Sequence, residues 1–155
     1  MSIENVRKYF QAFGIDNNIL EFELSSATVE LAAIALNCSP ARIAKTLSFK
    51  VEEAPVLIVC AGDARIDNAK YKSLFHKKAK MLTPDEVNEL IGHQIGGVCP
   101  FGIKENVSVY LDNSLKRFET VFPACGSSNS AIELTIPELE KYSNYEAWID
   151  VCKTV

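Results

Sequence analysis

Hydrophobic and polar positions follow two different periods along the chain, and each change of period marks an expected element. Apolar residues at Ile3, Val6 and Phe10 recur at helical spacing, and Gly14 stands at the expected end of that helix. Residues 19–24 (ILEFEL) alternate between apolar and acidic side chains, which is typical of a half-buried strand. An apolar helix is expected to follow over residues 28–37, with Ser26 as its N-cap.

The middle of the chain carries a clear strand pair. A serine–proline pair opens a short helix, and residues 46–51 (TLSFKV) then alternate, so Lys45 stands at the change from helix to strand. The continuous apolar run at 54–62 predicts a strand that is buried on both faces. Glu52 and Glu53 separate the two runs, and we expect a hairpin connection there.

The rest of the chain continues to interleave helices and strands. Two capping boxes, Thr83 with Glu86 and Thr135 with Glu138, each begin a helix. Further strands are expected at 79–82, 107–112, 119–124, 131–135 and 147–155, and further helical segments at 67–78 and 113–118. The pattern predicts an α/β fold in which residues 1–155 form a single domain with a mixed, strongly curved sheet.

The composition indicates where the protein is located and what state its cysteines are in. No apolar run approaches the length of a membrane span, and the charged N-terminus lacks the apolar centre of a signal peptide, so we expect a cytoplasmic protein that does not contact a membrane. The cysteines number five and are widely spaced without a C-x-x-C pair. We therefore expect reduced, mostly buried thiols and no metal site.

The net charge and its distribution along the chain limit the kind of partner that the protein can bind. A formal net charge of −4 argues against a protein that holds long nucleic acid through many phosphates, but it allows contact with a short nucleic-acid end. Residues 70–80 (KYKSLFHKKAK) contain five lysines and no acid. This segment is either a solvated helix face or a small docking patch for an anionic partner.

Known catalytic motifs are missing, and three weaker features remain. Lys45 lies between apolar residues at a helix-to-strand junction, where it either extends its amine into water or meets an anion or carbonyl in a cleft. Residues 96–102 (GGVCPFG) form a bare, rigid loop, and residues 124–134 (ACGSSNSAIEL) include a turn rich in hydroxyl groups. His76 and His93 are too few and too far apart for an ordinary two-histidine metal site, and His93 is interpreted as a polar loop residue.

The order and spacing of these three features resemble the YbaK and prolyl-tRNA-synthetase-associated family, in its stand-alone branch. The resemblance covers nearly the whole chain and extends through residues 115–135 and the ending WIDVCK. It implies an α/β fold with a curved, mixed and partly barrel-like sheet surrounded by helices, which agrees with the pattern. It implies hydrolysis of the ester that joins a wrong amino acid to the terminal ribose of tRNA, with alanyl-tRNA(Pro) or cysteinyl-tRNA(Pro) as the expected substrate. It implies the tRNA acceptor end and, by extension, an aminoacyl-tRNA synthetase as partners, with no cofactor.

The resemblance also implies roles for particular residues. The family's key lysine falls on Lys45, which would hold the terminal nucleotide through a phosphate or another substrate oxygen. The family's G-x-x-x-P element would line the aminoacyl pocket, and its glycine–serine turn would complete the rim. The residues implied for the site are Lys45 and Thr46, then Gly96, Gly97, Val98, Cys99, Pro100 and Gly102, then Gly126, Ser127 and Ser128.

Two expectations follow for substitutions at this site. Cys99 is expected to line the pocket and not to act as a nucleophile, because no histidine is assigned beside it. A side chain at Gly96 or Gly97 would either occupy substrate space or demand a disallowed φ, which would also cost stability. Gly97→Ala is expected to lower turnover far more than the melting temperature. A binding module that has lost the activity, and a hydrolase of another small ester, remain as alternatives.

Overall fold

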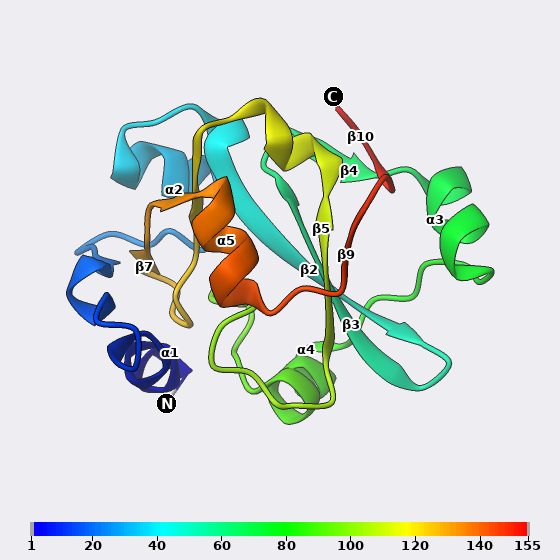
Figure 1. Ribbon diagram of the computed structural model, residues 1–155, viewed down its shortest axis with the longest axis horizontal. Helices are drawn as coiled ribbons and strands as arrows, with labels where there is room; N and C mark the ends of the chain where they lie inside the picture. The colour runs from blue at the N-terminus through cyan, green and yellow to red at the C-terminus, as the bar shows by residue number, and fades with distance from the viewer. Residues whose placement is uncertain (1, 155) are drawn as a thin grey trace.

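The computed structural model describes residues 2–154, and a mixed six-stranded sheet stands at its centre. The sheet curls into a half-barrel, as the sequence predicts, and β2 and β3 cross the middle of the view in Figure 1. Neighbouring strands are parallel except in the pairs β2–β3 and β6–β8. In spatial order the strands are β8 (Leu134–Thr135), β6 (Thr120–Pro123), β2 (Ile43–Val51), β3 (Ala54–Ala61), β5 (Ser108–Asp112) and β9 (Ala147–Ile149).

Helices surround the sheet, with α1 and α2 on the left of Figure 1 and α3 on the right. Two small antiparallel pairs complete the fold, β1 (Leu20–Glu21) with β7 (Ser130–Ala131) and β4 (Ala64–Ile66) with β10 (Cys152–Thr154). The helices are α1 (Ser2–Gln11), α2 (Val29–Leu36), α3 (Asn68–Phe75), α4 (Pro84–Glu86) and α5 (Ile136–Ser143), and α4 continues as a π-helix over Val87–Ile91. No helix within residues 2–154 is long and apolar enough to cross a membrane.

The hairpin of β2 and β3 fixes the register of the sheet. Glu52 and Glu53 form its two-residue turn, with φ of 49° and 69°. Two successive residues at positive φ give the turn the twist of the strands that it joins. Every residue of β3 after Ala54 is buried, as the continuous apolar run predicts.

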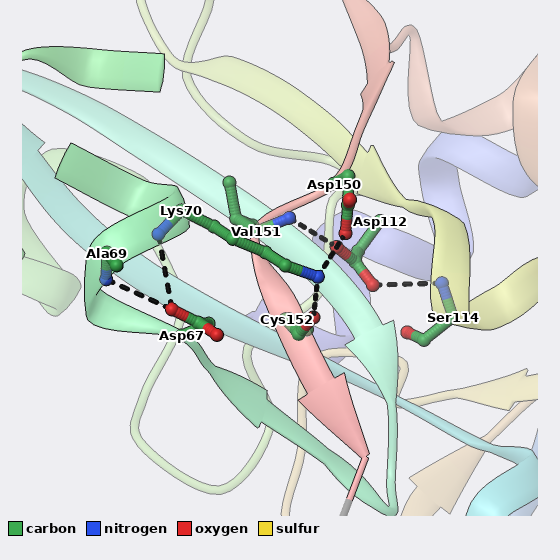
Figure 2. Close-up of polar contacts among 8 residues, drawn as sticks. All are labelled: Asp67, Ala69, Lys70, Asp112, Ser114, Asp150, Val151 and Cys152. Carbon is green, nitrogen blue, oxygen red and sulfur yellow. Dashed lines mark hydrogen bonds and ion pairs between the residues drawn. The ribbon is translucent and has the colours of Figure 1, made fainter. Parts of the chain in front are cut away.

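The C-terminal segment is held to the rest of the fold by polar contacts (Figure 2). The carboxylate of Asp112 is almost fully buried and accepts hydrogen bonds from the backbone N–H groups of Ser114 (2.9 Å) and Val151 (3.0 Å). Lys70 Nζ donates to Asp150 Oδ1 (2.9 Å) and to the carbonyl oxygen of Cys152 (3.1 Å). A carboxylate that accepts two backbone N–H groups offsets the cost of its burial, so Asp112 stabilises the end of the chain.

Several expectations about the elements are wrong in detail. The strand expected at 19–24 shortens to Leu20–Glu21, because only Ser130 and Ala131 pair with it, and Leu24 is 68% exposed. Thr28, not Ser26, caps α2, accepting from Leu31 N at 3.2 Å.

Three expected strands also differ from the structure. Segment 79–82 forms no named strand and contributes only a bridge between Met81 and Phe49. The strands expected at 131–135 and 147–155 are each interrupted, giving β7 and β8, and β9 and β10. The last residue of the second range, 155, lies outside the described residues.

Candidate functional site

A cavity of about 320 Å³ opens between α2, β2, the end of β6 and the start of the loop 96–102. Its volume falls in the range of pockets that hold small ligands. Most of its lining is apolar, and the polar part comes from hydroxyl groups of serine and threonine and from the amine of Lys45. The lining includes Ser26, Ala27, Thr28, Val29, Ile43, Lys45, Thr46, Ser48, Met81, Ile95, Gly96, Val98, Phe122, Ala124 and Ser130.

Lys45 is the only ionisable residue that lines this cavity among the residues the structure describes. It lies within β2, two residues after the strand begins, and its side chain is half-buried. Within residues 2–154 its amine has no hydrogen bond or ion pair. Asp63 lies near enough for Lys45 to contribute to its lowered pKa, but the main cause is the paired hydrogen bonds that Arg117 donates to Asp63. The charge of Lys45 is therefore available for an anion or a carbonyl oxygen.

Thr46, the next residue of β2, carries an unsatisfied group into the same cavity. Its Oγ1 is buried and has no hydrogen-bond partner among the described residues. A buried hydroxyl without a partner costs free energy, and such groups are rare in folded proteins. Thr46 Oγ1 is therefore a candidate contact for a ligand that enters the cavity.

The loop 96–102 separates two cavities. Gly96 and Val98 line the first, whereas Pro100 and Gly102 line a second cavity, also of about 320 Å³. The second cavity is bounded by Tyr9 of α1 and by the end of α5. The loop residues implied for the site therefore line two different cavities. Only the first part of the loop lines the cavity that contains Lys45.

Gly97 packs against protein and not against the cavity. A Cβ built on Gly97 would lie 2.5 Å from the backbone nitrogen of Ser127 and 2.6 Å from the carbonyl carbon of Gly126. The glycine is therefore required for the close approach of the loop 96–102 to the turn at 126–128. Gly96 has a φ of +95°, and a Cβ there would lie 3.2 Å from Ala27 Cβ at the cavity wall.

The hydroxyl-rich turn at 126–130 packs against the residues that form the wall of the first cavity. None of Gly126, Ser127 and Ser128 lines it, although Ser130 does. The carbonyl oxygen of Ser128 accepts a hydrogen bond from Ser26 N at 2.6 Å, and Ser127 Oγ donates to Ser130 Oγ at 2.6 Å. These contacts hold the turn against the segment that leads into α2.

Cys99 and His93 require two corrections. Cys99 points into the core and not into the cavity, and a histidine does lie beside it: Sγ is 3.4 Å from His93 Nε2, and both residues are fully buried. His93 is a loop residue, as interpreted from the sequence, but it is fully buried. The sequence could not show this, because the approach depends on how residues 93–101 fold back on themselves.

The two buried groups nevertheless lack the character of a nucleophile and its base. His93 Nε2 lies 2.8 Å from the carbonyl oxygen of Phe101, a partner that only an N–H can serve, so this nitrogen is not free to accept the thiol proton. Burial lowers the pKa of His93 and raises the pKa of the Cys99 thiol to about 12. Both side chains are neutral at pH 7, and they fix the loop instead of reacting.

Carboxylate, imidazole and thiol side chains are missing from the cavity lining that the structure describes, and Lys45 is its only ionisable group. No aspartate, glutamate, histidine or cysteine lines it. Within residues 2–154, no group of three His, Cys, Asp or Glu side chains is arranged to hold a metal ion. A reaction in this cavity would have to rely on positioning and on groups that the substrate supplies.

The lysine-rich segment 70–80 divides into paired and unpaired parts. Lys70 forms an ion pair with Asp150, and Lys77 Nζ lies 3.9 Å from Glu52 Oε1. Lys72, Lys78 and Lys80 are exposed. Met81, the residue that follows this segment, lines the first cavity, so the exposed Lys80 is next in the chain to a cavity-lining residue.

Comparison with known proteins gives consistent results. Residues 25–142 match the family model described as the aminoacyl-tRNA editing domain. The uncharacterized protein YwhH of Bacillus subtilis (strain 168) is 58% identical over 154 residues, covering 99% of this chain and 98% of that protein. A proline–tRNA ligase of Geobacillus sp. (strain WCH70) is 30% identical over 65% of this chain but over only 18% of the ligase. A crystal structure described as a candidate trans-editing enzyme for prolyl-tRNA synthetase superposes with a TM-score of 0.87 at 29% identity, covering 98% of this chain and 97% of the other.

Proposed function

Because the chain belongs to the aminoacyl-tRNA editing domain family, we propose that it is a trans-editing deacylase of mischarged tRNA. The reaction is hydrolysis of the carboxylic ester between a small amino acid and the terminal ribose. The proposed substrate is tRNA(Pro) carrying alanine or cysteine, a choice supported by the similarity to part of a proline–tRNA ligase and to the candidate trans-editing enzyme.

The observation that carries this proposal is the cavity beside Lys45. It is small, largely apolar and contains one positive charge, which suits a small aminoacyl group attached to an anionic nucleotide. Lys45 holds the terminal nucleotide through a phosphate or another oxygen of the substrate. Gly96 and Val98 contact the aminoacyl group, and Gly97 with Gly126, Ser127 and Ser128 keep that wall in place.

The proposed chemistry requires no catalytic acid or base from the protein. A water oxygen adds to the ester carbonyl carbon, the bond to the ribose oxygen breaks, and that oxygen leaves with a proton. One water proton ends on the ribose oxygen, carried there by a group on the substrate or by solvent, and the other is released to solvent as the amino acid leaves as its carboxylate. No carboxylate or imidazole lines the cavity within residues 2–154 to carry either proton. An activated ester in a desolvated, oriented position can react at a useful rate in this way.

A panel of mischarged tRNAs tests the proposal. The full chain is incubated with tRNA(Pro) charged with alanine, cysteine, serine or proline, and release of the amino acid is measured against the spontaneous rate. We expect hydrolysis of alanyl- or cysteinyl-tRNA(Pro) and survival of prolyl-tRNA(Pro). If no member of the panel is hydrolysed but alanyl-tRNA(Pro) still binds, the chain is a binding module and the proposal is wrong. Hydrolysis of simple amino-acid esters with no preference for tRNA would indicate an esterase instead.

A further inference from the structure

One edge of β2 is incompletely paired, and the gap opens into the cavity. On its inner side β2 pairs with β3 from Ala44 to Val51. On its outer side β6 reaches only as far as Ala44, and segment 80–82 covers the far end, where Lys50 N donates to Lys80 O (2.8 Å) and Leu82 N donates to Ser48 O (3.1 Å). Thr46 lies between these two covered ends. We call this gap in the outer edge of β2 the edge notch.

The alternation of an antiparallel pair fixes which way the backbone of Thr46 points. Residues of β2 direct their N–H and C=O groups alternately toward β3 and away from it. Ser48 and Lys50 direct theirs outward, since both bond to segment 80–82. Thr46 has the same parity, so its N–H and C=O also point outward, into the edge notch. The Oγ1 of Thr46 also has no partner, so one residue brings three polar groups to the cavity that are unpaired within residues 2–154.

These groups match the polar part of an amino-acid ester. An outward-facing edge residue normally meets the N–H and C=O of a single residue in the adjacent strand. The aminoacyl group of a charged tRNA carries an equivalent pair on one Cα, an α-ammonium group and an ester carbonyl.

We propose that the edge notch binds the aminoacyl group as a strand of one residue, an inference that rests on the proposed deacylase function. The C=O and Oγ1 of Thr46 accept hydrogen bonds from the α-ammonium group, and Thr46 N–H donates to the ester carbonyl oxygen. The hydrogen bond from the N–H polarises the carbonyl that water attacks.

The length of the edge notch decides what else can bind. Pairing with β6 ends at Ala44 and pairing with segment 80–82 begins at Ser48, so the uncovered edge is too short for a second residue of an added strand. An acyl group on the substrate nitrogen would extend toward one of these covered ends and would remove the charge that the acceptors bind. The site therefore selects a free amino acid over a peptidyl or N-acylated ester.

Binding of stable analogues tests the inference without requiring turnover. The probes are 3′-deoxy-3′-(L-alanylamino)adenosine, whose amide replaces the ester, and its N-acetyl derivative, each titrated calorimetrically into the full chain. The wild-type protein is expected to bind the N-acetyl derivative about tenfold more weakly or worse, the size expected when hydrogen bonds to a charged group are removed. Thr46→Val should weaken the free-amine analogue about tenfold, and Thr46→Ser should retain most of the binding.

Controls and outcomes separate this inference from the proposed function. Thr154→Val, the same change at an exposed position of β10, should bind like wild type. Thr46→Val is expected to fold, because it removes a buried hydroxyl that has no partner in the part of the chain that the structure describes. The inference is overturned if wild type binds both analogues equally, if it binds neither, or if Thr46→Val binds the free amine as well as wild type does. Binding with the expected selectivity but no hydrolysis on the tRNA panel would instead refute the deacylase function and leave the edge notch supported.

Discussion

Lys45 is the residue on which the proposed activity depends most directly. Its amine has no partner within residues 2–154, so Lys45→Ala removes a group that would bind substrate without leaving a buried charge unpaired. We expect kcat/KM for deacylation to fall about tenfold to a hundredfold, as for removal of one hydrogen bond between charged groups, with little change in melting temperature. Lys153→Ala, at an exposed position of β10, is the matched control. Full activity in a folded Lys45→Ala protein would remove Lys45 from the mechanism.

Cys99 should be dispensable for the reaction. The thiol is fully buried, its pKa is raised to about 12, and it faces the core. Cys99→Ala should therefore keep most of the deacylation rate and lower the free energy of unfolding by about 1 kcal/mol through the small cavity that it creates. The check is a rate measurement together with mass spectrometry of the wild-type enzyme during turnover. An acyl-thioester trapped on Cys99 would contradict the assignment.

His93 should make stability depend on pH. Burial holds its folded-state pKa below the ordinary value of 6.5, so the unfolded chain binds the proton more tightly. The contribution of His93 is complete above about pH 6.5 and is lost as the pH falls below that value, until the folded-state pKa is reached. Urea unfolding between pH 5 and 8 measures this loss. His93→Gln should reduce the slope in this window, whereas the exposed His76→Asn, which suits the left-handed backbone there, should leave it unchanged.

At the scale of elements, the contact between the loop 96–102 and the turn at 126–128 is the one most sensitive to substitution, because it leaves no room for an added Cβ. Gly97→Ala places a methyl group 2.5 Å from Ser127 N, so the two backbones must separate. We expect stability to fall by about 1–3 kcal/mol together with reduced turnover, which revises the sequence-based expectation that stability would largely be spared. Thermal unfolding and deacylation are measured on the same sample, with Ser73→Ala, at an exposed position of α3, as a control. An unchanged melting temperature would show that Gly97 faces substrate after all.

Sequence patterns predicted the elements where local physics decides them. The capping boxes at Thr83 and Thr135, the two-residue hairpin and the buried strand β3 are all as expected. The patterns failed where pairing partners decide, as in β1, which stays short because only two residues pair with it.

At the candidate site the same distinction holds. The resemblance brought Lys45, Thr46 and the glycine loop together, and the structure places all three at or beside one cavity. Which glycine touches another backbone, and that His93 lies against Cys99, depend on tertiary packing between segments. No periodicity within the sequence records such packing.

For the whole molecule, charge distribution predicts how tRNA approaches. The chain is acidic overall, with a net charge of −4, but Lys78 and Lys80 are exposed just before Met81 at the cavity. We expect Lys78→Ala and Lys80→Ala to weaken tRNA binding and to lower the slope of log K against log salt by up to about one for each phosphate that is no longer neutralised. Filter binding at several salt concentrations measures this slope. Lys8→Ala, an exposed position of α1, which lies across the view from α3 in Figure 1, should not change it. An unchanged slope in the Lys78 and Lys80 variants would leave the segment as a solvated face.

The edge notch also has a consequence for amide hydrogen exchange. Thr46 N–H points away from β3, and the N–H groups of its neighbours Lys45 and Leu47 point toward β3, because the direction alternates along an antiparallel pair. The amides of Lys45 and Leu47 are therefore hydrogen-bonded to β3. In the ligand-free protein, one rapidly exchanging amide should therefore stand between two protected ones in the middle of a central strand. An occupant that accepts a hydrogen bond from Thr46 N–H would slow that exchange. A single backbone proton would then report whether the cavity is filled, even for a ligand that is never cleaved.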